Sequence, residues 1–275
     1  MKEKYLIMDV AKCHDCNNCF LACEDEYVDN DWPGYQAPMP RHGHRWMDVL
    51  RHERGQNDRI DTAFLAKPCM QCEDAPCMKA GDFVSRREDG VVCFDPLAGK
   101  GKDITDSCPY GSIWWNEEEQ VSQKCDFCAH LLDDPSWEPA IPRCVHSCPT
   151  GALAFIEEEP AEFEKRAVAE GLAVWKSETG IKPHVWYRNL PRFTKNFIAG
   201  QLIKDGDVVA GAEVSLTRTD AEAGDAVGAV LVSDMFGEFR FDGLDDGEYR
   251  LSVSGKELKR VTVSGSSVDA GDFEI

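Results

Sequence analysis

Thirteen cysteines, all lying between Cys13 and Cys148, constrain the fold of this 275-residue chain more than any other feature of its sequence. Thiols crowded into one half of a chain favour metal ligation in a reducing compartment over a disulfide framework. Disulfides stay open as an alternative, although an odd number of cysteines cannot pair completely. The spacing of the thiols decides which metal group they suit.

The first run of cysteines, CHDCNNCFLAC, has the spacing C-x2-C-x2-C-x3-C and comprises Cys13, Cys16, Cys19 and Cys23. Three thiolates on one tight turn can each reach a different iron of a cubane, while the fourth faces a neighbouring cluster. Zinc, the alternative metal, normally uses two C-x2-C pairs. The run therefore predicts ligation of a [4Fe–4S] cluster.

Two later runs vary this pattern. In KPCMQCEDAPCMKAGDF, Gly81 stands where a fourth cysteine is due. The cysteines of that run are Cys69, Cys72 and Cys77. The last run is divided between KCDFC and RCVHSCPTGA, with a long insertion between its second and third cysteines. Its cysteines are Cys125, Cys128, Cys144 and Cys148.

Ligand exchange between partner runs sorts these cysteines into sets. In two-cluster ferredoxins, the fourth cysteine of one run completes the cluster held by the other run. Exchange between the first and last runs uses every cysteine of both. Group A then consists of Cys13, Cys16, Cys19 and Cys148, and group B of Cys125, Cys128, Cys144 and Cys23.

The stretch LAGKGKDITDSCPYG, residues 97–111, keeps a Cys-Pro tail although no cysteine precedes it there. Counting back from Cys108 with the spacing of the first run gives three ligand positions, and Gly81 would be the exchanged fourth. The three positions are Ala98, Gly101 and Ile104. All four losses fall on one cluster's complete set, so Cys108 is expected to serve the second run. Group C then consists of Cys69, Cys72, Cys77 and Cys108.

Three [4Fe–4S] clusters on twelve of the thirteen cysteines are therefore predicted. Cys93, in VVCFDP, is left over. A small buried hydrophobe on a strand is the simpler interpretation of this residue. A substitute ligand is the alternative, and it would require another donor to be displaced.

The amino-acid composition changes after about residue 155, where cysteine no longer occurs. EEEPAEFEKRAVAEGLAVW predicts a linker helix with Pro160 in its first turn, and SETGIKPHVWYRNLPRF predicts irregular chain. From Phe197 onward, short alternating runs separated by Gly/Asp turns predict a small antiparallel β-sandwich. SDMFGEFRFDGLDDGEYRLSV resembles the Ig-like modules of the carboxypeptidase-regulatory-like and collagen-adhesin B types. Such modules serve to bind a partner or to support the structure.

The predicted fold class is thus α+β, with a tandem ferredoxin-like [4Fe–4S] domain followed by the Ig-like sandwich. The expected boundaries are 1–158 for the cluster domain, 159–196 for the linker and 197–275 for the sandwich. No catalytic constellation is visible in either domain.

The charge of the chain argues against several partners. Fifty acidic and thirty basic residues give a net charge of −20, which repels nucleic acid and anionic membrane surfaces. No apolar run approaches the ~20 residues that span a bilayer, and MKEKYLIMDV meets charges too early for a secretory signal. We therefore expect a cytoplasmic protein that binds neither nucleic acid nor membrane.

From Tyr5 to about Phe155 the chain resembles the iron–sulfur subunits of molybdopterin oxidoreductases, the family of the dimethyl sulfoxide reductase and formate dehydrogenase electron-transfer subunits. The matching segments are YLIMDVAKCHDCNNCFLACEDE, KPCMQCEDAPC, CPYGSIWWN, KCDFC and RCVHSCPTGAL. The chain departs from the four-cluster pattern of that family at Gly81, Ala98, Gly101 and Ile104. It also lacks the C-terminal membrane helix of some relatives.

A three-cluster subunit joined to a β-sandwich resembles the small subunits of molybdenum transhydroxylases. The resemblance implies a large catalytic partner, in a heterodimer or a multiple of it, that carries molybdenum with two molybdopterin guanine dinucleotides. It implies hydroxyl transfer between polyhydroxybenzenes at that metal, with this chain as the electron-transfer subunit. Another soluble molybdopterin oxidoreductase, a free-standing polyferredoxin and a scaffold with redox-silent clusters are the alternatives.

Overall fold

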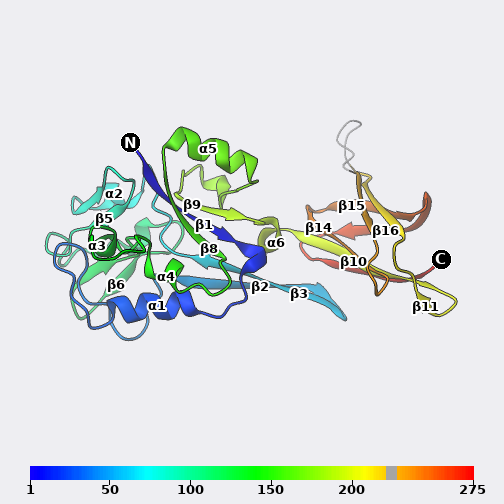
Figure 1. Ribbon diagram of the computed structural model, residues 1–275, viewed down its shortest axis with the longest axis horizontal. Helices are drawn as coiled ribbons and strands as arrows, with labels where there is room; N and C mark the ends of the chain where they lie inside the picture. The colour runs from blue at the N-terminus through cyan, green and yellow to red at the C-terminus, as the bar shows by residue number, and fades with distance from the viewer. Residues whose placement is uncertain (221–227) are drawn as a thin grey trace. The chain divides into compact units, whose positions relative to one another are not determined.

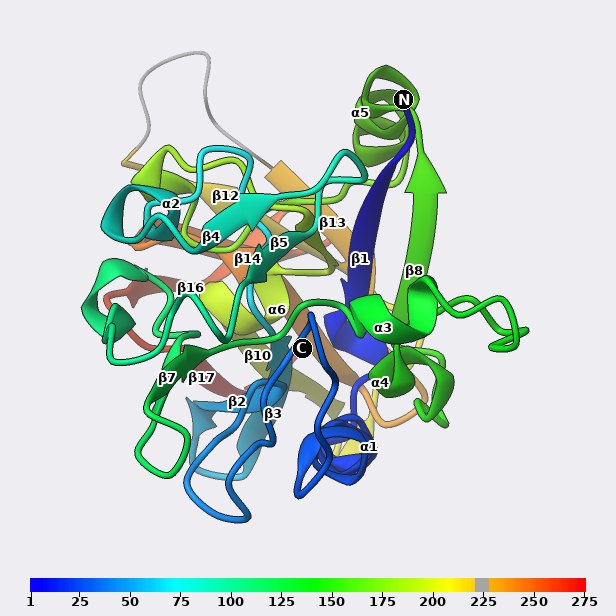
Figure 2. The same ribbon diagram turned by 90° about the vertical axis from the view of Figure 1, so that its left-hand side faces the viewer.

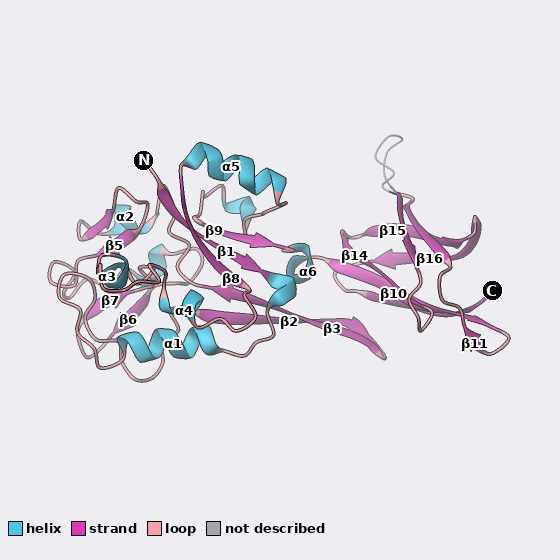
Figure 3. Cartoon of the chain, in the orientation of Figure 1, coloured by secondary structure: helices cyan, strands magenta, loops and turns pink. Residues whose placement is uncertain are grey.

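The computed structural model describes residues 1–220 and 228–275, and the chain divides into two compact units. The first unit contains residues 1–50 and 64–190, and the second contains residues 51–63 and 191–275. Figure 1 shows the elements of both units. Figure 3 shows that loops and short helices dominate the first unit, whereas long strands dominate the second.

A three-stranded sheet organises the first unit. Its central strand, β1 (Glu3–Asp9), pairs antiparallel with β8 (Leu153–Glu158) and parallel with β9 (Val185–Arg188). Helix α5 (Pro160–Ala169) covers this sheet, and its Phe163 stacks on Tyr5 with ring centroids 3.7 Å apart. The helix begins at Pro160, as the sequence predicts.

Residues 159–190 thus belong to the first unit, which differs from the expected linker at 159–196. The reason is the apolar face of α5, which buries Phe163 and Ala167 against Tyr5 and Ile7 of β1. The segment expected to be irregular also contributes β9 to the sheet edge, because its residues Val185 and Tyr187 are fully buried.

The remaining elements of the first unit are short, and most of them adjoin a cysteine run. They are α1 (Asn18–Tyr27), α2 (Cys77–Ala80), α3 (Ala129–Leu132), α4 (Arg143–His146) and the hairpins β4–β5 (Val84–Arg86, Val92–Phe94) and β6–β7 (Trp114–Asn116, Val121–Gln123), with single 3-10 turns at Val10–Lys12, Thr105–Ser107 and Ser177–Thr179. Helices α1 and α4 pack together, α4 also contacts β8, and Figure 2 shows β1 and β8 running side by side.

The second unit is a two-sheet sandwich. One sheet has the order β11-β10-β14 with β17 on the other side of β10, and the second has the order β13-β12-β15-β16. The strands are β10 (Asn196–Lys204), β11 (Asp207–Val208), β12 (Glu213–Arg218), β13 (Gly228–Val232), β14 (Glu238–Leu244), β15 (Gly247–Val253), β16 (Lys256–Val263) and β17 (Val268–Glu274). All pairs are antiparallel except β10 with β17, which is parallel. Helix α6 (Pro191–Thr194) precedes β10.

The tip of the hairpin formed by β2 (Asp48–Gln56) and β3 (Arg59–Lys67) belongs to the second unit. Arg54 fixes it there, because this 5% exposed guanidinium pairs with Asp61 at 2.8 Å and with Asp242 at 2.6 Å. Asp61 in turn accepts from Arg192, and these cations hold its pKa at about 2 although burial opposes the shift. Among residues 1–220 and 228–275, no helix is long and apolar enough to cross a membrane.

Candidate iron–sulfur centres

The thiols of group A surround one cavity. Cys13, Cys16, Cys19 and Cys148 all line a hollow with about 350 Å³ of empty space, together with Met8 and Thr150. The run that carries the first three bends tightly because Asp15 and Asn17 adopt left-handed backbone conformations, with φ of 55° and 58°. Burial, together with the charges of the other thiols of the group, raises the pKa of Cys19 to about 12. Cys16 alone in this set is exposed.

The thiols of group C surround a second cavity of similar size, with about 340 Å³ of empty space. Its lining includes Cys69, Cys72, Cys77 and Cys108. Burial raises the pKa of Cys77 to about 11, and the Cys69 thiol adds to the rise. Gln71, which is fully buried with φ of 50°, turns the chain between the first two thiols of the set.

Group B is the most deeply buried of the three. Cys23, Cys125, Cys128 and Cys144 are each 6–8% exposed. Burial raises the pKa of Cys23 well above that of an ordinary thiol, and the three other thiols of the group raise it further. Group B is therefore a dry gathering of four thiols drawn from α1, α4 and the residues that lead into α3.

Each set of thiols fits a [4Fe–4S] cluster. Such clusters take four thiolates and are tuned by hydrogen bonds to the sulfurs. Backbone N–H groups donate to the sulfurs here: Ser112 N lies 3.4 Å from Cys108 Sγ, and Phe127 N lies 3.4 Å from Cys125 Sγ. The donor sets are wholly sulfur, and the walls of the two cavities are largely apolar.

Group B is close to each of the other two thiol groups. Cys19 of group A is among the charges that raise the pKa of Cys144 in group B. Cys69 of group C likewise raises the pKa of Cys125 in group B. These two pairs of thiols connect the groups in the order A, B, C.

A phenylalanine fills the region of the missing ligand set. A Cβ atom built on Gly81 would lie 2.3 Å from one edge of the Phe83 ring, and a Cβ on Gly99 would lie 2.7 Å from the opposite edge. The ring is 4% exposed and packs edge-to-face on Phe94 at 5.5 Å. Ile104 is buried nearby in sequence, whereas Ala98 and Gly101 are exposed. An aromatic side chain thus occupies the space beside Gly81, where the spacing of the second run leads one to expect a fourth cysteine.

Cys93 lies on β5, as the simpler interpretation of the sequence expects, and lines neither thiol cavity. Burial raises its pKa to about 11, while Lys124 acts in the opposite direction. Its charged neighbours are Lys124, Asp126, Arg87 and Asp89, and no other thiol is among its five strongest influences.

Two family models match the chain. One is described as a 4Fe-4S dicluster domain and covers residues 60–158, and the other is a carboxypeptidase regulatory-like domain that covers residues 198–274. The pyrogallol hydroxytransferase small subunit of Pelobacter acidigallici is 47% identical over 280 residues, which span 100% of both chains. The chain belongs to the family of that small subunit.

More distant relatives agree with this assignment. A tetrathionate reductase subunit from Salmonella typhimurium is 26% identical over 67% of this chain and 72% of its own length. The nitrate-inducible formate dehydrogenase iron–sulfur subunit of Escherichia coli is 29% identical over 64% of this chain and 62% of its own length. The predicted family of molybdopterin-enzyme iron–sulfur subunits and the predicted fold class are both confirmed.

Sequence reasoning missed the charged side chains that this family member buries between the thiol groups. Lys124 is fully buried, lines the cavity of group C and donates to the carbonyls of Val92 and Cys125. Burial works to lower its pKa, but Cys69 and the other nearby thiols outweigh it, so the pKa is raised. Asp126, 1% exposed, accepts hydrogen bonds from the Tyr27 hydroxyl at 2.6 Å and from Cys128 N at 3.0 Å. Only their positions beside Cys125 could have signalled these residues.

Gln71 joins the second cysteine run to the last one. Its Nε2 donates to the Cys125 carbonyl at 2.7 Å, and its Oε1 accepts from Val92 N at 2.7 Å. This buried amide holds the walls of groups B and C together. The sequence offers no signal for it beyond its place inside a cysteine run.

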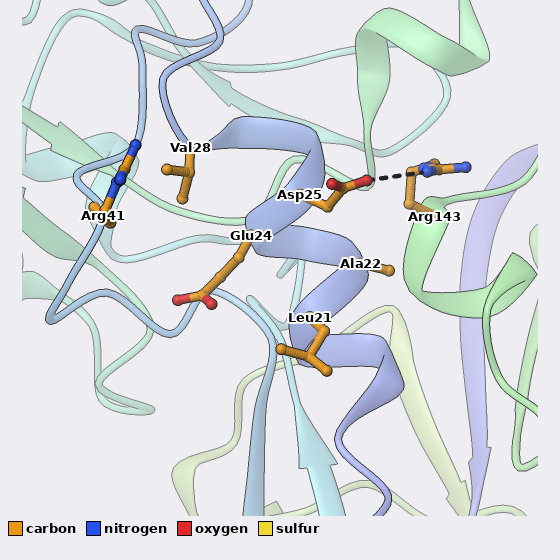
Figure 4. Close-up of a pocket in the computed structure, with 7 residues that line it drawn as sticks. All are labelled: Leu21, Ala22, Glu24, Asp25, Val28, Arg41 and Arg143. Atoms are coloured by element: carbon orange, nitrogen blue, oxygen red, sulfur yellow. Dashed lines mark hydrogen bonds and ion pairs between the residues drawn. The ribbon is translucent and has the colours of Figure 1, made fainter.

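The outer face of α1 forms a shallow groove above the buried thiols. Leu21, Ala22 and Val28 line it, with Glu24, Asp25, Arg41 and Arg143 as charged members. Figure 4 shows the Asp25 carboxylate turned toward Arg143, a contact of 3.5 Å. Leu21 is 56% exposed although its helix carries two buried cysteines on the opposite face. The groove is thus an apolar strip with charges at its margin.

Proposed function

We propose that this chain is the electron-transfer subunit of a heteromeric molybdopterin enzyme that moves a hydroxyl group between polyhydroxybenzenes, the pyrogallol hydroxytransferase type. The observation that carries the proposal is the gathering of twelve thiols into three sets of four that match the ligand exchange expected from their spacing. The full-length 47% identity to the small subunit from Pelobacter acidigallici supports the substrate class.

The proposed cofactors are divided between this chain and its partner. Groups A, B and C would each hold one [4Fe–4S] cluster, within a cluster domain of residues 1–158. Molybdenum with two molybdopterin guanine dinucleotides would lie in a large partner subunit in the cytoplasm, and catalysis would occur there. The role of this chain's own residues is to hold, space and electrostatically tune the electron carriers.

Hydroxyl transfer between two phenols involves no net gain of electrons. We therefore infer that the series of groups A, B and C resets or poises the partner's metal and does not conduct electrons in every turnover. Rapid-freeze spectra of the working enzyme test this inference. Clusters that change redox state at the rate of each turnover would contradict it.

We infer that the partner docks over the groove on α1. Cys16 is the most exposed of the twelve proposed ligands, and Leu21 is an exposed apolar side chain on the helix that follows it. Covering both would exclude water from group A and bring it within reach of the partner. Leu21→Asp should prevent copurification of the large subunit, while Leu97→Asp, at an 87% exposed leucine, should not. Equal copurification of both variants would place the interface elsewhere.

The principal test is a metal and labile-sulfide analysis of the anaerobically purified protein together with its subunit composition. About twelve irons per copy of this chain, with molybdenum and a larger subunit, are expected. About sixteen irons would contradict the loss of one ligand set. Twelve irons without molybdenum or partner would favour a free-standing polyferredoxin. A second test is hydroxyl transfer by the complex, and activity only on non-phenolic substrates would favour another molybdopterin oxidoreductase.

A further inference from the structure

A buried cation and a buried carboxylate flank one cysteine, and they face different thiol groups. Lys124 and Asp126 are the neighbours of Cys125 in the chain, and both are at most 1% exposed. The charge of Lys124 acts on Cys69, Cys72 and Cys77 of group C. The charge of Asp126 acts on Cys23, Cys125 and Cys128 of group B.

The ammonium of Lys124 forms no direct ion pair in the described part of the chain, and Asp126 is the carboxylate whose charge acts on it. This ammonium contacts two backbone carbonyls and lies 5.0 Å from the centre of the Phe94 ring. Burying an ammonium without an anionic partner is costly. A cluster with four thiolates carries net negative charge, so the cavity beside Lys124 is built for such a group.

A second buried lysine strengthens the positive field at group C. Lys67 is 8% exposed, donates to the carbonyls of Tyr110 and Gly111, and is influenced by the charge of Cys108. The two lysines therefore bear on group C from different segments of the chain. Group B has no such cation among the strongest charged influences on its four thiols.

Both oxygens of the Asp126 carboxylate accept hydrogen bonds. Three donors point at it: the Tyr27 hydroxyl, the backbone N–H of Cys128 and the Gln36 amide at 3.4 Å. Asp126 thus places negative charge beside group B in a region closed to water.

We propose that Lys124 and Asp126 set the order of reduction in this chain, so that group C takes up an electron before group B does. A nearby cation favours the reduced, more negative form of a cluster, and a nearby anion disfavours it. Neither charge is screened by solvent or salt as a surface charge would be. Because group C ends the series A, B, C, an electron that reaches it is retained there, beyond a less easily reduced group B.

This inference rests on the proposed function, because it presumes that the three thiol groups hold [4Fe–4S] clusters. It goes further by naming the positioning residues and the member of the series that stores the electron. The order A, B, C alone would serve for conduction in either direction. The charges make the series directional.

The test is an EPR-monitored redox titration of the purified complex, with dithionite as the reductant. Lys124→Met should lower the midpoint potential of one cluster by at least a tenfold change in its reduction equilibrium, about 59 mV for one electron. Asp126→Asn should raise the potential of a different cluster by a similar factor. Cys108→Ser identifies group C, because the signal it removes should be the one that Lys124→Met shifts.

Lys79→Met is the matched control, because Lys79 follows the ligand Cys77 by two positions but is exposed. It should change no midpoint by more than about twofold, since water and salt screen its charge. Lys67→Met provides the second variant if Lys124→Met fails to retain iron, and it should lower the same midpoint.

Three outcomes would each overturn the inference. The midpoint potentials could stay unshifted, or Lys79→Met could shift a midpoint as much as Lys124→Met does. The lysine and aspartate variants could also shift the potential of the same cluster. The wild-type iron content and subunit composition, measured on the same sample, test the proposed function separately. Twelve irons and a molybdenum partner with unshifted potentials would reject the electrostatic inference alone.

Discussion

The first unit contains two halves that share one cysteine pattern and differ in what they retain of it. The first half, built from Cys13–Cys23 and Cys125–Cys148, keeps every ligand position and gathers two sets of thiols. The second half, built from Cys69–Cys77 and Leu97–Gly111, keeps one set and carries Phe83 beside the lost one. The losses are concentrated in a single set, which leaves the other set of the same half complete.

The difference between the halves concerns how the space of an absent cluster is filled. A cluster contributes volume as well as charge, and protein interiors tolerate few voids larger than a water molecule. Gly81 and Gly99 leave room for the Phe83 ring, which packs against Phe94 and lies 5.5 Å from the Lys102 ammonium. The aromatic ring supplies apolar packing in the half that is proposed to hold one cluster fewer.

The largest expected effect separates retained ligands from lost ones. Cys108→Ser should remove one cluster, about four of about twelve irons, because it takes a thiolate from group C. Ala98→Ser, at an exposed position of the lost set, should leave the iron content unchanged. Iron analysis and EPR spectra of the anaerobically purified variants measure both. Full iron content in Cys108→Ser would show that the second half uses a different fourth ligand.

Removing the ring from the second half should cost the most stability without touching a ligand. Phe83→Ala deletes a 4% exposed ring and should lower the free energy of unfolding by about 3–5 kcal/mol. The urea midpoint for bleaching of the cluster absorbance measures the change. Phe236→Ala, at a 62% exposed phenylalanine, is the control and should shift that midpoint little. Equal shifts in the two variants would mean that Phe83 fills no space the fold depends on.

A methyl group on Gly81 should test the fit between that residue and the ring. Gly81→Ala places a Cβ 2.3 Å from the Phe83 ring, and overpacking of this kind costs about 1–3 kcal/mol. Gly81 has an extended backbone with φ of −156°, so the expected cost comes from the clash and not from backbone strain. In the Phe83→Ala background the same substitution should be nearly neutral, and a double-mutant cycle measures that coupling. Additive costs would refute the contact.

Cysteine spacing alone leads to the three proposed thiol sets, because covalent spacing along tight turns limits which sulfurs can meet. The residues between the sets escaped prediction for the opposite reason. Lys124, Asp126 and Gln71 acquire their roles from segments far away in the chain, such as Val92 and Tyr27. A local sequence pattern does not indicate which distant residues become neighbours in the folded chain.

The fold was likewise predicted in part, with local features foreseen and tertiary contacts missed. Alternation of apolar residues revealed the strands of the sandwich, but it does not encode the direction of pairing, so the parallel contact of β10 with β17 was not foreseen. The hairpin tip at 51–63 was also missed, because it is tertiary contacts, such as the ion pairs of Arg54 with Asp242 and of Arg59 with Asp269, that join it to the sandwich. The boundaries expected at 158 and 197 reflect changes in composition, whereas the compact units follow packing.

The smallest expected effect concerns Cys93. Its substitution tests whether Cys108, and not Cys93, is the fourth ligand of group C. Cys93→Ala removes one sulfur from β5 and should cost no more than about 1 kcal/mol, with no loss of iron, because no proposed ligand set includes it. Its pKa of about 11, raised by burial, predicts that alkylation of this thiol in the wild type accelerates as pH rises toward that value. A cluster ligand would resist alkylation at every pH at which the cluster survives. Loss of about four irons in Cys93→Ala would therefore make Cys93 a ligand, and Cys108 would then be the thiol left over in the comparison between the two halves.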